Sequence, residues 1–208
     1  MELHEAIRRR AMVRSFSREP VSRDEVDRIL MAALRSPTAG NSQGTAWVVL
    51  EGPEQTAGYF DAATDRAWRT RHPEWSDGLA RAPVVLLAYS SADAYVARYA
   101  EADKAAAGLG EDEGAWPVPY WIGDAAFGVM TVLLAAVDAG LGACILGTFR
   151  GEADLAAQLG VPEGWRLFCA VVLGHPDGRD HRSASLERPG PTASERIHRG
   201  RWRGPVEL

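Results

Sequence analysis

The chain has 208 residues, of which 46% are hydrophobic and 25% charged, the usual composition of one globular domain. Its net charge of −5 and isoelectric point near 5.6 exclude the basic surface of a nucleic-acid binder. The polar start MELHEAIRRR does not resemble a signal peptide. The most apolar stretch, residues 125–137, is shorter than the ~20 residues of a membrane span and is bracketed by Asp124 and Asp138. We therefore expect a cytoplasmic protein of one domain, residues 1–208, without nucleic-acid or membrane partners.

The first half of the chain is expected to alternate helices with one strand. Apolar residues on one face predict a helix over residues 2–11, and an irregular arginine-bearing segment follows it. Ser22 and Glu25 form a capping box that begins a second helix, which Pro37 ends. The segment SPTAGNSQG then forms a loop, AWVVL a strand, and residues 53–63 a helix.

The second half contains the predicted core. Residues 64–80 have a mixed composition, with tryptophans inside a charged stretch, and no structure is assigned to them. The segment PVVLLAY after them is a buried strand by its unbroken apolar run. A helix is expected over residues 92–107, then the loop GLGEDEGAWPVP, then the central helix 121–140, which ends at a glycine. ACILG is a short strand or turn, residues 151–159 a helix, and RLFCAVVLG the last core strand. The tail from residue 175 has almost no apolar pattern, so it is disordered or held against another surface.

The two cysteines, Cys144 and Cys169, lie in apolar runs and are predicted to be small buried side chains. The five histidines are scattered without the spacing of metal ligands, so no metal site is expected. No serine lies in a GxSxG turn, and neither a dinucleotide fingerprint nor a phosphate-binding P-loop occurs. Because none of these motifs occurs, the sequence motifs for nucleophiles and nucleotides do not identify a reaction.

Two polar segments carry candidate chemistry. The first contains Arg10 and Arg14, four residues apart, and arginine offers planar paired donors that suit a phosphate. The same residues are equally typical of a solvated basic helix end. The second is the loop SPTAGNSQG, where Thr38, Asn41 and Gln43 could offer polar groups to the edge of a heteroaromatic ring. Taken alone, this loop is also compatible with a simple turn.

The order of the segments resembles the nitroreductase family. IRRRAMVRSFSREPV resembles the opening arginine motif of that family, SPTAGNSQG its polar loop, and DAAFGVMTVLLAAVDAGLGACILGTF its central helix and glycine turn. VPEGWRLFCAVVLGHP resembles its last strand, and RIHRGRW a common C-terminal pattern. Residues 52–80 and 92–118 lie outside the resemblance. The order of the five segments is more specific than any one of them.

The resemblance implies an α+β fold, a three-layer sandwich in which helices flank a mixed, mainly antiparallel sheet. It also implies an intertwined homodimer with two FMN sites at the interface, in which the polar loop of one subunit lines the flavin of the other. Arg10 and Arg14 then hold the FMN phosphate, and a tail arginine completes that site; we assign Arg188, with Arg201 as second choice. The other implied cofactor-binding residues are Ala11, Met12, Pro37, Thr38, Ala39, Asn41, Gln43, Leu146 and Gly147.

This chain departs from the family pattern at two places. Ala11 replaces a usual arginine and Met12 a usual serine, so one charge and one side-chain donor are absent. Their backbone amides remain available to a ligand. Gly44-Thr45 replaces the usual Pro-Trp at the end of the polar loop.

The function implied by the resemblance is electron transfer through FMN. NADH or NADPH reduces the flavin and leaves, and a nitroaromatic, quinone or related acceptor then enters the same slot, in a ping-pong cycle. We assign no catalytic side chain, because this cycle requires none. Tyr120, Trp121 and Phe127 are candidates for the substrate pocket or, equally, for core packing. Two alternatives stay open: an FMN-dependent oxidase or dehydrogenase of a biosynthetic intermediate, and a non-catalytic flavin carrier or regulator.

Overall fold

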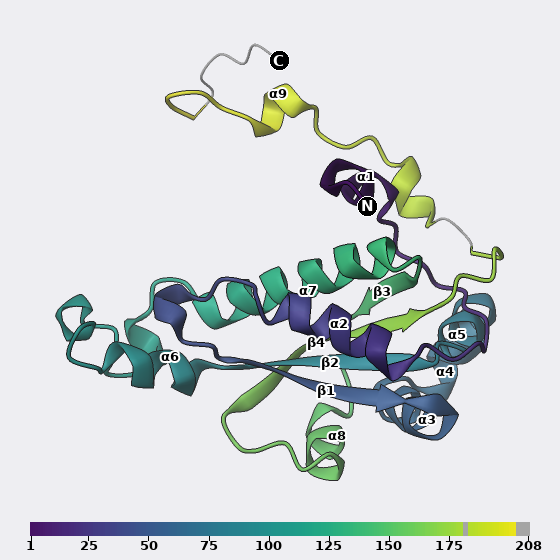
Figure 1. The fold of residues 1–208 in the computed structure, drawn as a ribbon, viewed down its shortest axis with the longest axis horizontal. Helices are drawn as coiled ribbons and strands as arrows, with labels where there is room; N and C mark the ends of the chain where they lie inside the picture. The colour runs from purple at the N-terminus through teal and green to yellow at the C-terminus, as the bar shows by residue number, and fades with distance from the viewer. Residues whose placement is uncertain (181–182, 203–208) are drawn as a thin grey trace.

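The computed structural model describes residues 1–180 and 183–202, and Figure 1 shows a central sheet with helices packed against it. Neighbouring strands pair antiparallel in the order β1-β2-β4-β3, so β1 and β3 are the two edges of the sheet. The strands are β1 (Thr45–Glu51), β2 (Val84–Ser91), β3 (Gly142–Leu146) and β4 (Trp165–Gly174). The four strands are thus antiparallel throughout rather than mixed. Among the described residues, parallel pairing is limited to an isolated bridge between Met12 and Ala143.

Helices account for most of the remaining chain. The α-helices are α1 (Leu3–Arg9), α2 (Arg23–Ala33), α3 (Gly52–Ala63), α4 (Arg66–Arg71), α5 (Pro73–Leu79), α6 (Ala92–Tyr99), α7 (Tyr120–Asp138), α8 (Glu152–Gln158) and α9 (Ala193–Arg196). Short 3-10 helices are η1 (Ala39–Asn41), η2 (Ala105–Ala107), η3 (Glu113–Ala115) and η4 (Ala184–Glu187).

The sheet is buried on both faces, which explains the unbroken apolar runs of its central strands. Side chains alternate along β2: Leu86 packs in a cluster with residues of α2 and α7, whereas Leu87 packs in a second cluster with residues of α3 and α8. Every residue of β2 is buried. Figure 1 accordingly shows α2 and α7 on one side of the sheet and α3 and α8 on the other.

Local sequence signals fix several helix ends as predicted. Ser22 Oγ accepts a hydrogen bond from Glu25 N–H at 3.3 Å, and Glu25 Oε2 accepts one from Ser22 N–H at 3.2 Å, so the capping box at the start of α2 is confirmed. At the end of α7, Gly140 has φ +75° and donates to Val137 O, while Leu141 donates to Ala136 O. This pair of bonds closes the helix through a left-handed glycine, as expected.

One expectation for the helices was wrong, and one segment without a prediction is helical. The helix predicted over residues 92–107 ends at Tyr99, because the chain turns back and Arg98 binds Asp103 with two hydrogen bonds of 2.7 Å. The mixed segment 64–80 contains two short helices, α4 and α5. Asp65 caps the first by accepting from Trp68 N–H at 2.6 Å, and a proline begins the second.

Helix α7 is long and apolar enough to cross a membrane by length and composition alone. It packs on α2 and on strands β1 to β4, as the core helix of a globular protein does. Only 39% of its most apolar window is buried within the chain. Its outer face is therefore an apolar surface that one chain leaves uncovered.

Candidate functional site

The arginine segment crosses the start of β3 and contacts the first residues of the tail. Val13 N–H donates to Ala143 O at 3.0 Å, and Arg14 N–H donates to Asp180 Oδ1 at 2.8 Å. The Arg14 side chain donates from Nη1 to Met12 O at 3.0 Å. Arg10 lies at the C-terminal cap of α1, one turn earlier. The backbone around Arg14 is thus held by a strand edge on one side and by the tail on the other.

A buried carboxylate ties this segment to the tail. Asp177 Oδ2 accepts hydrogen bonds from Ser15 Oγ at 2.9 Å and from Arg81 Nη2 at 3.0 Å. Arg81 also donates to Phe16 O at 3.0 Å. Burial alone would raise the pKa of Asp177, but hydrogen bonds from Arg179 and Ser15 and the charge of Arg179 lower it below the usual value. These residues were not identified from the sequence.

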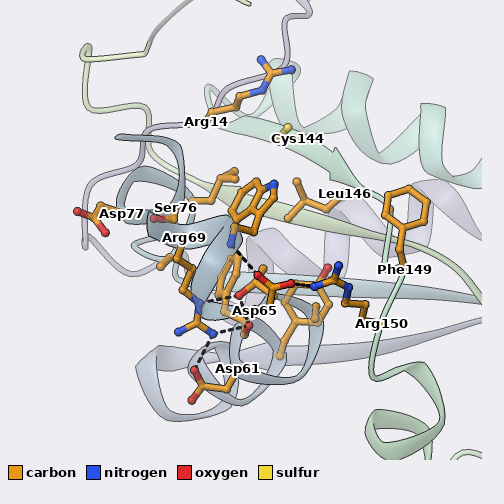
Figure 2. A pocket seen from close by; sticks show the side chains of 18 of the residues that line it. Arg14, Asp61, Asp65, Arg69, Ser76, Asp77, Cys144, Leu146, Phe149 and Arg150 are labelled. Carbon is orange, nitrogen blue, oxygen red and sulfur yellow. Dashed lines mark hydrogen bonds and ion pairs between the residues drawn. The ribbon is translucent and has the colours of Figure 1, made fainter. Parts of the chain in front are cut away.

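Arg14 lines a large cavity with a volume of about 650 Å³. Leu146 and Gly147, at the end of β3, line the same cavity, as do Trp68 and Phe60. Figure 2 shows Arg14 and Cys144 at one end of the cavity and Asp61 at the other, with Leu146 between them. The structure therefore brings together Arg14 from the arginine motif and Leu146 and Gly147 from the glycine turn, two motifs far apart in the sequence.

Ion pairs form the far wall of this cavity. Arg69 Nη2 pairs with Asp61 Oδ1 at 2.9 Å, and Arg150 pairs with Asp65 (Figure 2). The acidic groups of this wall are therefore offset by arginines within it. The lining is otherwise mostly apolar and aromatic, which suits a planar ring. None of these wall residues was predicted. Asp61, Asp65 and Arg69 belong to residues 52–80, which lie outside the motifs that carried the prediction, and Arg150 directly follows the last residue of the glycine-turn motif.

The two cysteines are buried, as predicted. Burial raises the pKa of Cys144 to about 11 and that of Cys169 to about 12. Both thiols therefore stay protonated near neutral pH and are poor nucleophiles. Cys144 lines the large cavity but adds no reactive group to it.

The polar loop forms a second, smaller site. Thr38, Asn41 and Gln43 line a cavity of about 250 Å³ together with Trp47 and Asp124. Asn41 and Gln43 have φ of +57° and +51°, a left-handed conformation that residues other than glycine rarely adopt. Pro37 and Ala39 belong to the same loop but do not line the cavity.

Within one chain, the loop and the large cavity do not meet. The loop precedes β1 at one edge of the sheet, whereas Leu146 ends β3 at the opposite edge. The two cavities also lie on opposite faces: Trp47 packs in the cluster with α2 and α7, and Cys144 in the cluster with α3 and α8. The predicted cofactor-binding residues thus form two separate half-sites in this structure.

The remaining predicted residues lie away from the large cavity. Tyr120 and Trp121 join an aromatic cluster around Trp116, with ring centroids 5.9 and 6.0 Å from that of Trp116. Phe127 is 53% exposed on the outer face of α7. Arg188 and Arg201 are exposed in the tail, which extends away from the sheet in Figure 1.

Comparison with known proteins places this geometry in a family. Residues 7–175 match the model of the nitroreductase family. The chain is 27% identical over 197 residues to a protein of Archaeoglobus fulgidus named as an NADH dehydrogenase/NAD(P)H nitroreductase, over 93% of this chain and 94% of that protein. It is 26% identical over 175 residues to an FMN reductase (NAD(P)H) of Bacillus subtilis, over 84% of this chain and 66% of that enzyme.

Solved structures show the same fold. The nitroreductase CinD of Lactococcus lactis, crystallised with chloramphenicol, superposes with a TM-score of 0.68 at 19% identity, over 92% of this chain and all of that one (100%). NfrA2 of B. megaterium superposes with a TM-score of 0.70 at 20% identity, over 97% of this chain and 76% of that one. At this level of identity, the likeness establishes the architecture.

Proposed function

The chain belongs to the nitroreductase family, and we propose that it is an FMN-dependent oxidoreductase that uses NADH or NADPH to reduce small-molecule acceptors such as nitroaromatics and quinones. The observation that carries this proposal is the large cavity in which Arg14, Leu146 and Gly147 meet. The names of the Archaeoglobus and Bacillus relatives support the same reaction class.

The cavity fits FMN in size and in chemistry. Its volume of about 650 Å³ lies within the range of roughly 300–1,000 Å³ typical of cofactor sites. Its aromatic and apolar walls suit a planar ring, and Arg14 at one end suits an anionic phosphate. Arg10 and the backbone of Ala11 and Met12 would extend the phosphate site. Arg188, or else Arg201, would complete it from the tail.

FMN, when bound, supplies the redox chemistry between NAD(P)H and the acceptor. The chain itself binds and orients the reactants. The backbone of Leu146 and Gly147 would offer amides beside the ring and stabilise negative charge there. Trp68 would exclude water from the slot, because it lines the cavity with a large apolar surface. One slot would serve donor and acceptor in turn, so the two should compete with each other.

Anaerobic stopped-flow absorbance tests the proposed reaction. The FMN-loaded protein should lose its flavin absorbance on mixing with NADH or NADPH and regain it on adding a quinone. Steady-state kinetics should then give parallel double-reciprocal lines. A sample that neither nucleotide bleaches would refute the reductase and favour an FMN-dependent oxidase or a non-catalytic flavin carrier.

The phosphate assignment has its own test. Arg14→Ala should weaken FMN binding by about 1.5–3 kcal/mol, the range for a hydrogen bond to a charged group. Arg8→Ala is the control, because Arg8 is an exposed arginine of the same segment that pairs with Glu5 on its own helix and does not belong to the lining given for the cavity. Equal FMN affinity in the two variants, measured by quenching of flavin fluorescence, would contradict the assignment.

We further propose that the protein is a cytoplasmic, intertwined homodimer in which each subunit is a three-layer sandwich. Phe127 and Met130 on α7, Met31 on α2 and Leu34 at the C-terminal cap of α2 are all exposed large apolar residues, and the two helices pack together. Such a surface is typical of a protein interface. Residues 1–208 would form one domain, with the tail from residue 175 lying on the partner. Tyr120 and Phe127 would then border the acceptor slot from this interface, with Trp121 packed behind them.

Light scattering tests the dimer. The wild-type protein should have the mass of two chains, and Phe127→Glu should shift it toward the monomer and lose FMN. Val118→Glu is a matched control, since Val118 is 51% exposed, close to the 53% of Phe127, but lies outside α2 and α7. A monomeric wild-type protein that still binds FMN would refute the dimer.

A further inference from the structure

The loop of residues 37–43 is strained and must be held in place by its surroundings. Gly40, Asn41 and Gln43 all have positive φ, a conformation that glycine and asparagine tolerate but that glutamine rarely adopts. Such conformations persist only where neighbouring contacts over-determine them. Hydrogen bonds inside the loop, such as Gln43 N–H to Thr38 Oγ1 at 3.1 Å, shape its turn but do not attach it to the rest of the fold.

A buried carboxylate from a distant helix supplies the first external contact. Asp124 on α7 is only 5% exposed, and its Oδ2 accepts a hydrogen bond from Ala39 N–H at 2.7 Å. The same oxygen accepts one from Tyr95 Oη at 2.7 Å. Tyr95 on α6 is fully buried and stands edge-to-face against Trp116 and Trp121. The carboxylate thus joins three segments, the loop, α6 and α7, at one atom.

A second contact comes from the next turn of α6. Arg98 Nε donates to Gly40 O at 3.0 Å. The guanidinium is itself fixed by Asp103, which accepts bonds of 2.7 Å from both Nη1 and Nη2. The ring of Tyr99 lies directly over Gly40: a Cβ built on Gly40 would be 2.7 Å from its Cε2 atom. The loop is therefore held by contacts at residues 39 and 40, just before Asn41 and Gln43 with their positive φ.

We propose that Asp124, with Tyr95 and Arg98, is a positioning residue that holds this loop in the conformation with which it completes the flavin site of the partner subunit. The inference rests on the proposed FMN-dependent function. It assigns a role to a residue that is not among those lining the large cavity. If the loop moved away, the buried Asp124 carboxylate would lose the hydrogen bond from Ala39 N–H, and a buried carboxylate without its donors is strongly destabilised. That cost couples the loop to α6 and α7.

Hydrogen exchange of the protein without FMN tests directly whether Asp124 holds the loop. In Asp124→Ala, amides of residues 37–44 should exchange faster, and FMN binding should weaken by roughly ten- to a hundredfold, the effect of losing one hydrogen bond to a charged acceptor. Asp124→Asn keeps an oxygen that can accept both hydrogen bonds at roughly half their strength. Its loop exchange rate and FMN affinity should therefore lie between those of wild type and Asp124→Ala. Tyr95→Phe removes one donor, keeps the ring packing, and serves as the milder variant if Asp124→Ala fails to fold. Unchanged loop exchange in these variants, or unchanged FMN affinity, overturns the proposal.

A mixed dimer separates positioning from simple destabilisation. One subunit carries Arg14→Ala and the other Asp124→Ala, each with its own affinity tag. If Asp124 acts through the loop on the partner's flavin, one site contains both defects and the other contains none, so one FMN per dimer should bind with wild-type affinity. If Asp124 only stabilises its own subunit, no site is intact and no tight FMN remains, which overturns the proposal. Failure of wild-type protein to bind FMN would instead refute the proposed function, while loop exchange in the variants would still decide whether Asp124 holds the loop.

Discussion

Replacing Gly40 by alanine tests how tightly α6 holds the polar loop. Gly40 has φ +62°, where an L-residue costs about 1–2 kcal/mol. The added Cβ would also lie 2.7 Å from Tyr99 Cε2. The Tyr99 ring is backed by Trp116 at a centroid distance of 4.7 Å, so it cannot move away freely. Overpacking of this kind costs about 1–3 kcal/mol. The two effects together predict a loss of about 2–5 kcal/mol in the free energy of unfolding.

Gly108→Ala is the control that separates the clash with Tyr99 from the backbone cost of positive φ. Gly108 has φ +68°, close to that of Gly40, but nothing lies within 4 Å of a Cβ built on it. Urea unfolding at matched protein concentration should therefore show only the backbone cost of about 1–2 kcal/mol. In a double-mutant cycle, Tyr99→Ala should recover most of the extra loss in Gly40→Ala. Equal losses in the two glycine variants, or no coupling to Tyr99, would refute this account of the loop.

Two further predictions concern stability. Ser22→Ala removes the capping box of α2 and should lower the free energy of unfolding by about 1 kcal/mol in urea titrations; no change would mean the box is dispensable. Asp177 has a lowered pKa in the folded state, so it stabilises the fold above the ordinary carboxyl pKa of about 3.9, and this contribution is lost as pH falls through its folded pKa. The stability of Asp177→Asn should accordingly fall less steeply than that of wild type below about pH 4; parallel curves would count against the role of Asp177.

Much of the fold could be predicted because its signals are local. The unbroken apolar run of β2 indicates a strand buried on both faces, and the capping box and Gly140 mark helix ends within a few residues of sequence. The helices of residues 64–80 were not predicted, for the opposite reason. Its helices α4 and α5 are short, carry many charges and rest on a cap by Asp65 and on a proline at residue 73, signals that are weak without the surrounding structure.

The contacts that hold the two half-sites in place join residues far apart in the sequence, so no local sequence pattern predicts them. Asp177 meets Ser15 across 162 residues, and Asp124 meets Ala39 across 85. Asp124 was visible only as a charge at the edge of the most apolar stretch, the position of a helix boundary as much as of a buried acid. No spacing rule connects it to the loop that it binds. The family resemblance pointed to Arg14 and the polar loop but not to what holds either of them.

Each half-site is held rigid by its own chain, Arg14 by Asp180 and the loop by Asp124, yet the halves lie on opposite edges and faces of one sheet. If FMN bridges two subunits, binding and dimerisation must be thermodynamically linked. FMN should then lower the dissociation constant of the dimer, and the apparent FMN affinity should rise with protein concentration until dimerisation is complete. Both can be measured by titrating FMN into protein at concentrations above and below the dimer dissociation constant. A site built within one chain would bind FMN with the same affinity at every protein concentration, and that result would show that the half-sites do not meet across the interface.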